Sequence, residues 1–198
     1  TTGNYNTSVG SDSLKANISG HNNTALGFEA LQAATVSNNT ALGYQAGLLV
    51  TTGTNNTFVG TLAGDAVTTG SSNQFMGVGA GGGVVGGTST QGNHNIGIGY
   101  NSFVESVVLT TGSHNIAIGN FTRTNAADST FATVIGYNVA GTSGYTTLGK
   151  DAEDIRAAHG NITWATVSDE RYKKDIVDST AGLAFINALQ PRTWKYKT

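Results

Sequence analysis

The chain has 198 residues, of which only 11% are charged, 28 are glycine and none is cysteine, and its net charge is −2. This charge argues against a nucleic-acid-binding face, which would be basic, and the absence of cysteine excludes disulfides and thiolate metal sites. No apolar run approaches the roughly 18 residues that span a bilayer, so we expect neither a nucleic-acid partner nor insertion into a membrane.

Residues 1–149 consist of a repeat that ends on glycine. Neighbouring repeats are mostly 16 or 17 residues apart. One unit of this length cannot bury a core alone, whereas stacked units can. The sequence therefore predicts a mainly β fold in which residues 1–149 form a β-solenoid. The units are NTSVG, NTALG, NTALG, NTFVG, NQFMG, NIGIG, NIAIG, ATVIG and YTTLG, and they end at Gly10, Gly27, Gly43, Gly60, Gly77, Gly99, Gly119, Gly136 and Gly149.

Each position of the repeat has a physical interpretation. Side chains alternate between the two faces of a strand, so the apolar residue before the glycine lies opposite the asparagine and the usually small middle residue. The asparagine can bond to turn backbone or form a ladder with its copies. We expect one short strand per unit, room for a second, and a thin interior that holds one large apolar residue per strand. Such a thin solenoid gains by association, and a threefold bundle would bury its apolar or small face.

The stretches GHNNTALGFEAL and SNNTALGYQAG (Gly20–Leu31 and Ser37–Gly47) resemble the repeats of trimeric autotransporter adhesin heads, and similar repeats occur in bacteriophage tail fibres. The resemblance implies a left-handed parallel β-roll that assembles as a homotrimer. The spacing lengthens to 22 and 20 residues before Gly99 and Gly119. We expect the insertions at residues 79–92 and 101–112 to form protruding loops.

Three histidines and one glycine-rich stretch are candidate ligand sites in the repeat. His21, His94 and His114 could bind an ion on a threefold axis, but we expect them to be turn residues bonded to backbone, so no metal or cofactor is predicted. Gly77–Gly87 is glycine-rich, but it lacks the following Lys-Ser/Thr and the helix of a phosphate-binding loop.

Four aromatic residues could stack on sugars: Tyr44, Tyr100, Tyr137 and Phe103. We expect them to pack between coils instead. Paired carboxylates do not recur at a consistent register in the repeat. Glycan hydrolysis by the solenoid is therefore not expected.

The composition changes near Gly149. Residues 1–149 carry seven charged side chains and 26 glycines, whereas the 49 residues from Lys150 carry fifteen and two. Leu183, Ile186 and Leu189 recur at helical spacing before Pro191, which predicts a helix near residues 180–190 and then a strand at residues 192–197. We therefore predict a short α+β segment at residues 168–198, joined to the solenoid by a connector at residues 150–167.

The stretch SDERYKKDI (Ser168–Ile176) places Ser168 five residues before Lys173. A serine can act as a nucleophile with a lysine as its general base when burial or a nearby positive charge lowers the lysine pKa, and Lys174 could supply that charge. On chemistry alone, a serine followed by mixed charges is more often a solvated cap.

This stretch, with LAFINALQPRTWKYK (Leu183–Lys197) behind it, resembles the start of the phage intramolecular chaperone domain. That domain is a self-cleaving serine peptidase class (peptidase S74) found after tail fibres and tailspikes. Ser168, Asp169 and Lys173 match its hallmark. The resemblance implies a chaperone that templates trimerisation and then cuts Val167–Ser168, with Ser168 as nucleophile and Lys173 as base. The family's domain is longer, so residues 168–198 correspond to its start.

These features predict a structural virion protein, a trimeric tail fibre or tailspike segment for host-cell attachment, whose only enzymatic activity is self-cleavage. Its expected partners are two further copies of itself, other virion tail proteins and a bacterial surface receptor, with a polysaccharide as one candidate. The alternative is a trimeric adhesin head on a bacterial cell surface, which predicts a membrane-anchoring barrel or a coiled-coil stalk downstream. A scaffold fibre without a ligand is a third hypothesis, and it predicts no surface loops.

Overall fold

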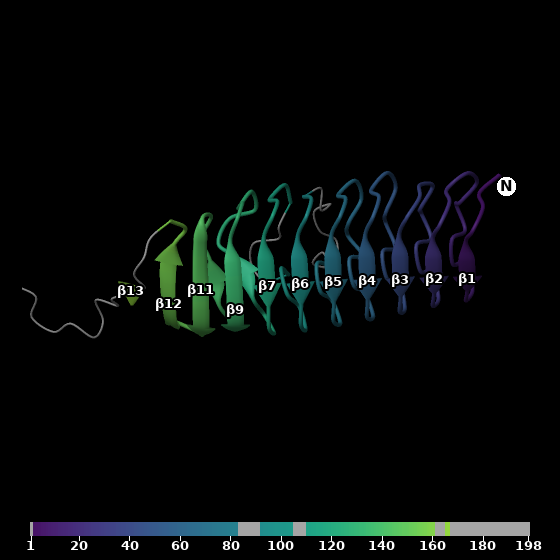
Figure 1. Cartoon of the computed structure of the whole chain (residues 1–198). Helices are drawn as coiled ribbons and strands as arrows, with labels where there is room; N and C mark the ends of the chain where they lie inside the picture. The colour runs from purple at the N-terminus through teal and green to yellow at the C-terminus, as the bar shows by residue number, and fades with distance from the viewer. Residues whose placement is uncertain (1, 83–91, 105–109, 161–164, 167–198) are drawn as a thin grey trace, which may run out of the picture. The chain divides into compact units, whose positions relative to one another are not determined.

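The computed structural model describes residues 2–82, 92–104, 110–160 and 165–166, which form a β-solenoid of about eight coils (Figure 1). These residues belong to a compact unit that spans Thr1–Val167. The described part contains strands and turns but no helix, and hence no helix that could cross a membrane. The prediction of a mainly β solenoid is confirmed. The predicted helix near residues 180–190 and the strand after it lie outside the described residues.

Each coil contributes one strand to a sheet of 11 strands, in the order β1-β2-β3-β4-β5-β6-β7-β9-β11-β12-β13. The first seven strands have three residues each: β1 (Thr7–Val9), β2 (Thr24–Leu26), β3 (Thr40–Leu42), β4 (Thr57–Val59), β5 (Gln74–Met76), β6 (Ile96–Ile98) and β7 (Ile116–Ile118). The sheet continues with β9 (Thr133–Tyr137), β11 (Tyr145–Lys150), β12 (Glu153–Ala158) and β13 (Ala165–Thr166).

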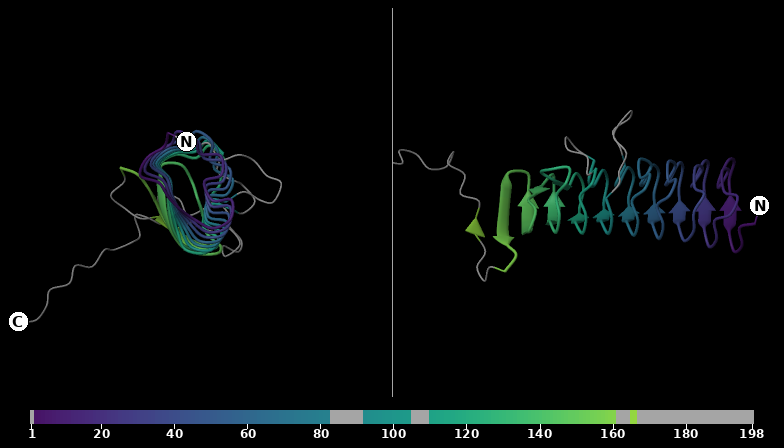
Figure 2. Two further views of the ribbon diagram at one scale, coloured as in Figure 1. Left: turned by 90° about the vertical axis from the view of Figure 1, so that its right-hand side faces the viewer. Right: turned by 90° about the horizontal axis from the view of Figure 1, so that it is seen from above.

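The strands from β1 to β11 are parallel, and equivalent positions of the repeat face each other. Thr24 pairs with Thr40, and Leu26 pairs with Leu42. An end-on view shows the successive coils superimposed along one axis (Figure 2). The sheet changes direction at β12, which is antiparallel to β11 and to β13. This change falls where the glycine repeat ends in the sequence.

A second strand forms in only two of the described coils, where β8 (Arg123–Thr124) pairs with β10 (Ala140–Gly141). Elsewhere the chain leaves the glycine through tight turns. The Ala30 N–H donates to the Gly27 carbonyl at 3.3 Å, and the Ala34 N–H donates to the Leu31 carbonyl at 3.1 Å. In the early coils, the segment that could have formed a second strand therefore forms turns.

The interior differs from the prediction in one respect. From β2 to β7 the middle residue of each strand fills it, for example Ala25 and Phe58, and Val134 does so in β9, each 0% exposed. The large apolar residue before the glycine lies on the outer face, as does Leu26, which is 45% exposed. The reason is the asparagine two residues before the middle position, because it points inward to bond the next coil and alternation then places the middle residue inside. The expectation of one large apolar residue per strand in the interior was therefore wrong.

Bulk in the interior is shared between the strand and the turn that faces it. Phe58 and Phe75 fill the coils where glycines stand opposite, and a Cβ added at Gly64 would collide with the Phe58 ring. The sixth coil reverses the arrangement, because Gly97 is the small partner and Phe103 is the large one. Because the two positions pack closely, a larger side chain at either the strand position or the facing turn position would not fit.

A ladder of asparagines joins neighbouring coils by hydrogen bonds, as the repeat suggested. Each asparagine Oδ1 accepts the backbone N–H of the equivalent residue in the next coil, at 2.9 to 3.1 Å. Each Nδ2 donates to a turn carbonyl of the next coil, at 2.6 to 3.0 Å. The members of the asparagine ladder are Asn6, Asn23, Asn39, Asn56, Asn73, Asn95 and Asn115.

A second ladder consists of the glycines that end the strands. Gly60 has φ +132°, a conformation that side chains with a Cβ rarely adopt, and its Cβ position lies 2.6 Å from the carbonyl oxygen of Gly77 in the next coil. The equivalent glycines of the other coils show the same close backbone contact. This explains why glycine recurs at the position.

Candidate functional site

The predicted catalytic residues Ser168, Asp169 and Lys173 lie outside the described residues, as does Val167. The last described strand, β13, ends at Thr166 and pairs with β12. The predicted scissile bond Val167–Ser168 therefore follows one residue after a strand of the solenoid sheet. The pairing of Ser168 with Lys173 stays a prediction.

The three histidines of the repeat make the backbone contacts expected of turn residues. His21 Nδ1 accepts the Asn4 N–H at 3.0 Å, and the backbone N–H groups of His94 and His114 each donate to a carbonyl in the preceding coil at 3.0 Å. The rings of His94 and His114 are stacked, with centroids 4.8 Å apart. No group of three or more possible metal ligands occurs in the part of the chain that the structure describes.

The aromatic residues pack between coils, as predicted. Phe103 is 2% exposed and lies in the core, where its ring contacts Phe75. The exposed Tyr44 stacks on Phe28 with centroids 5.6 Å apart, and Tyr100 contacts Phe121 edge to face. The tyrosine rings are only partly covered by these contacts, since Tyr44 is 47% and Tyr100 46% exposed.

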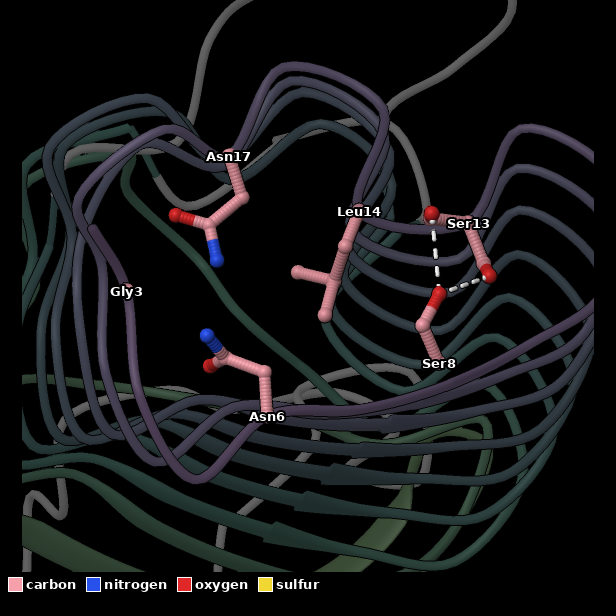
Figure 3. A pocket seen from close by; sticks show the side chains of 6 residues that line it. All are labelled: Gly3, Asn6, Ser8, Ser13, Leu14 and Asn17. Atoms are coloured by element: carbon pink, nitrogen blue, oxygen red, sulfur yellow. Dashed lines mark hydrogen bonds between the residues drawn. The ribbon is translucent and has the colours of Figure 1, made fainter. Parts of the chain in front are cut away.

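A hollow lies at the open end of the first coil (Figure 3). It is lined by Gly3, Asn6, Ser8, Ser13, Leu14 and Asn17. Its polar groups already bond to neighbouring protein groups. The Asn6 amide donates to the Gly20 carbonyl at 2.8 Å, Asn17 Oδ1 accepts the Gly20 N–H at 2.8 Å, and the Ser8 hydroxyl donates to the Ser13 carbonyl at 3.0 Å. This hollow is the uncovered end of the solenoid interior, and nothing in it points to a ligand.

The described residues form an exposed apolar ridge that follows the glycine ladder. One column consists of the residues before the glycines: Val9, Leu26, Leu42, Val59, Met76, Ile98, Ile118 and Ile135. The other consists of the residues after them: Ser11, Phe28, Tyr44, Thr61, Val78, Tyr100, Asn120 and Tyr137. All of these are exposed except Val59, which is half-buried.

The sequence identified the first column as apolar but assigned it to the interior, and of the second column it singled out only Tyr44, Tyr100 and Tyr137. The signal was present, because no residue that follows a repeat glycine in the first eight coils is charged. Whether these uncharged residues form one exposed column depends on the turn that follows the glycine, and the structure shows this turn.

The comparisons with known proteins concern the C-terminal segment. Residues 168–198 match the family model described as chaperone of endosialidase (Peptidase_S74). No curated protein and no solved structure matches the chain. The class defined by the fold of the described residues is a β-solenoid. This match behind a β-solenoid in the sequence supports a tail-fibre or tailspike type of protein.

Proposed function

We propose that this chain is a homotrimeric segment of a virion tail fibre or tailspike that attaches to a bacterial surface, and that residues 168–198 begin an intramolecular chaperone that releases itself. The observation that carries the proposal is the family match, which begins at Ser168, directly behind a β-solenoid. Ser168 is also the residue that the sequence marks as the nucleophile.

The solenoid gives a physical reason for such a chaperone. Hydrogen bonds between coils join residues that are 13 to 22 positions apart in the chain. The entropy of bringing these segments together is lost before the contacts form. A domain that trimerises early raises the effective concentration of the strands, and its removal afterwards makes the wound fibre slow to unfold.

The proposed cleavage uses two groups. Lys173, as a neutral amine, takes the proton of the Ser168 hydroxyl, whose oxygen attacks the Val167 carbonyl carbon. The C–N bond breaks, the proton passes to the Ser168 amine, and Val167 is left as an ester on the Ser168 oxygen. Water then hydrolyses this ester and gives a Val167 carboxylate. Asp169 stands next to the nucleophile and matches the family hallmark, and its proposed role is to orient these groups.

The test is the intact mass of the chain, expressed with its complete downstream sequence. The wild-type chain should yield a fragment that ends at Val167, and the two products together should weigh one water more than the precursor. Ser168→Ala should remain uncut because the nucleophile is missing.

A matched pair of lysine variants tests the base. Lys173→Arg keeps the positive charge but cannot deprotonate at neutral pH, so it should remain uncut, whereas Lys174→Arg should be cut. Equal cleavage of Ser168→Ala and the wild type would contradict the assigned nucleophile. A wild-type chain that trimerises uncut would remove the peptidase role and leave the chaperone role.

A further inference from the structure

We infer that the apolar ridge is the contact surface between copies of this chain, and that the copies lie parallel with equal coils at the same level. The inference rests on the proposed function for its threefold symmetry. It adds the interface, the register and the orientation, which the family match does not supply.

The ridge carries no charged side chain. The ridge has sixteen positions over eight coils, and none is Asp, Glu, Lys or Arg. The neighbouring outward column of the same sheet is also uncharged: Thr7, Thr24, Thr40, Thr57, Gln74, Ile96, Ile116 and Thr133. In the first five coils, Asp12 and Glu29 directly follow the ridge residues Ser11 and Phe28, and Lys15 and Asp65 lie further along their turns. Large exposed apolar surfaces mark sites of association.

The ridge runs along a corner of the coil. In six coils the third residue after the glycine donates its N–H to the glycine carbonyl, at 3.2 to 3.5 Å, as Ala46 does to Gly43. The chain therefore turns sharply at the glycine. Leu42 stands on the sheet side of this corner, and Tyr44 occupies the turn itself. A corner of this kind suits a threefold assembly, because one column can face one neighbour while the other column faces the second neighbour.

The spacing of the ridge indicates which partner packs against it. The rungs of the ridge repeat with the strand spacing, about 4.8 Å, so eight coils make a ridge on the order of 35 Å long. A partner that packs against every rung must repeat at the same spacing. A second copy of the solenoid has that spacing because it consists of the same coils. In a parallel orientation, equivalent coils of the two copies lie side by side. A globular partner would match only a few rungs.

A charge on the ridge tests the inference against a matched control. Leu42 is 43% exposed on the ridge, and Leu49 is 47% exposed on a later turn of the same coil. Leu42→Lys brings three charges into the proposed interface and should weaken the trimer by about tenfold or more, whereas Leu49→Lys should not change it. Native mass spectrometry and sedimentation of the expressed chain measure the oligomer, and circular dichroism confirms that both variants keep their β structure.

Cysteine pairs test register without disturbing charge, because the chain has no cysteine of its own. In the double variant Leu42→Cys/Tyr44→Cys, each chain should bond to the next at the same level and close a covalent trimer under oxidation. Val9→Cys/Tyr44→Cys separates the two sites by two coils, roughly 10 Å, which exceeds the Cα separation of about 7 Å that a disulfide tolerates. This second pair should give no covalent trimer.

The outcomes separate the interface from the proposed function. A trimer that survives Leu42→Lys, and that forms no disulfide between chains in the Leu42→Cys/Tyr44→Cys variant, overturns the assigned interface and leaves a trimeric fibre standing. Equal cross-linking of both cysteine pairs overturns the equal-level register. A wild-type chain that remains monomeric overturns the trimer and the interface together, while the self-cleavage test above still stands on its own.

Discussion

Gly60→Ala should lower the stability of the solenoid by about 4 kcal/mol, because two costs add. A residue with a Cβ is strained at φ +132°, which costs about 1–2 kcal/mol or more. The added methyl group would also stand 2.6 Å from the carbonyl oxygen of Gly77 in the next coil. Relief of that contact requires the coils to separate, and overpacking of this kind costs about 1–3 kcal/mol.

The loss should be visible as a lower urea midpoint of the expressed chain, followed by circular dichroism. A solenoid transmits the defect to both neighbours, because each coil is stabilised only by the coils next to it. We therefore expect the coils on either side of Gly60 to lose protection from hydrogen exchange before the ends do.

Gly144→Ala is the matched control for this prediction. Gly144 also has a positive φ, +73°, but a Cβ there would meet nothing within 4 Å. Its substitution should cost only the conformational strain, about 1 kcal/mol. Equal losses at Gly60 and Gly144 would show that the contact between coils contributes nothing and that conformation alone explains the repeated glycine.

The repeat predicted the sheet but not which face of it is internal. Alternation along NTALG correctly set the asparagine and the middle residue on one side and the leucine on the other. Hydrophobicity then favoured the leucine for the interior, and this choice was wrong for Leu26 and Leu42. The deciding contribution is the asparagine amide, which satisfies two backbone groups of the next coil only when it points inward. A buried polar ladder therefore overrides the ordinary apolar rule.

The packing of the large interior side chains could not be predicted from one repeat unit. Phe58 and Phe75 occupy a position that is small in the first coils, and they fit because glycine stands in the facing turn. The partner lies on a different part of the coil, so its identity depends on the exact path of the turn. The corner residues were not recognised as one column for the same reason, since Phe28 and Val78, for example, follow the glycine and lie outside the strand pattern.

Asn56→Asp should be the second severe substitution, with an expected loss of about 3–5 kcal/mol at neutral pH. Asn56 is 1% exposed. Its Nδ2 donates to the Gly70 carbonyl at 2.9 Å and to Asn39 Oδ1 at 3.1 Å. Aspartate has the same shape but replaces this donor by an oxygen, so a buried negative charge would face two acceptors. The bond that Asn56 Oδ1 accepts from the Asn73 N–H, at 2.9 Å, would survive.

Asn55→Asp is the control, because the neighbouring Asn55 is exposed and its side-chain amide donates to the Thr54 hydroxyl at 3.2 Å. The same chemical change there should cost less than about 1 kcal/mol. The comparison uses the urea midpoints of the two variants and of the wild type at one pH.

The stability loss of the Asn56→Asp variant should depend on pH, whereas the loss from a simple packing defect would not. Burial against acceptors should raise the pKa of the new carboxyl above its unfolded value of about 3.9. The folded state then binds the proton more tightly than the unfolded state, so stability is regained as the pH falls through the folded pKa and is lost as the pH rises through it. The protonated carboxyl also recovers a donor for the Gly70 carbonyl. A loss that stays the same at pH 7 and at pH near 5 would mean that the ladder acts through shape alone, and the hydrogen-bonding role assigned to all seven asparagines would fall with it.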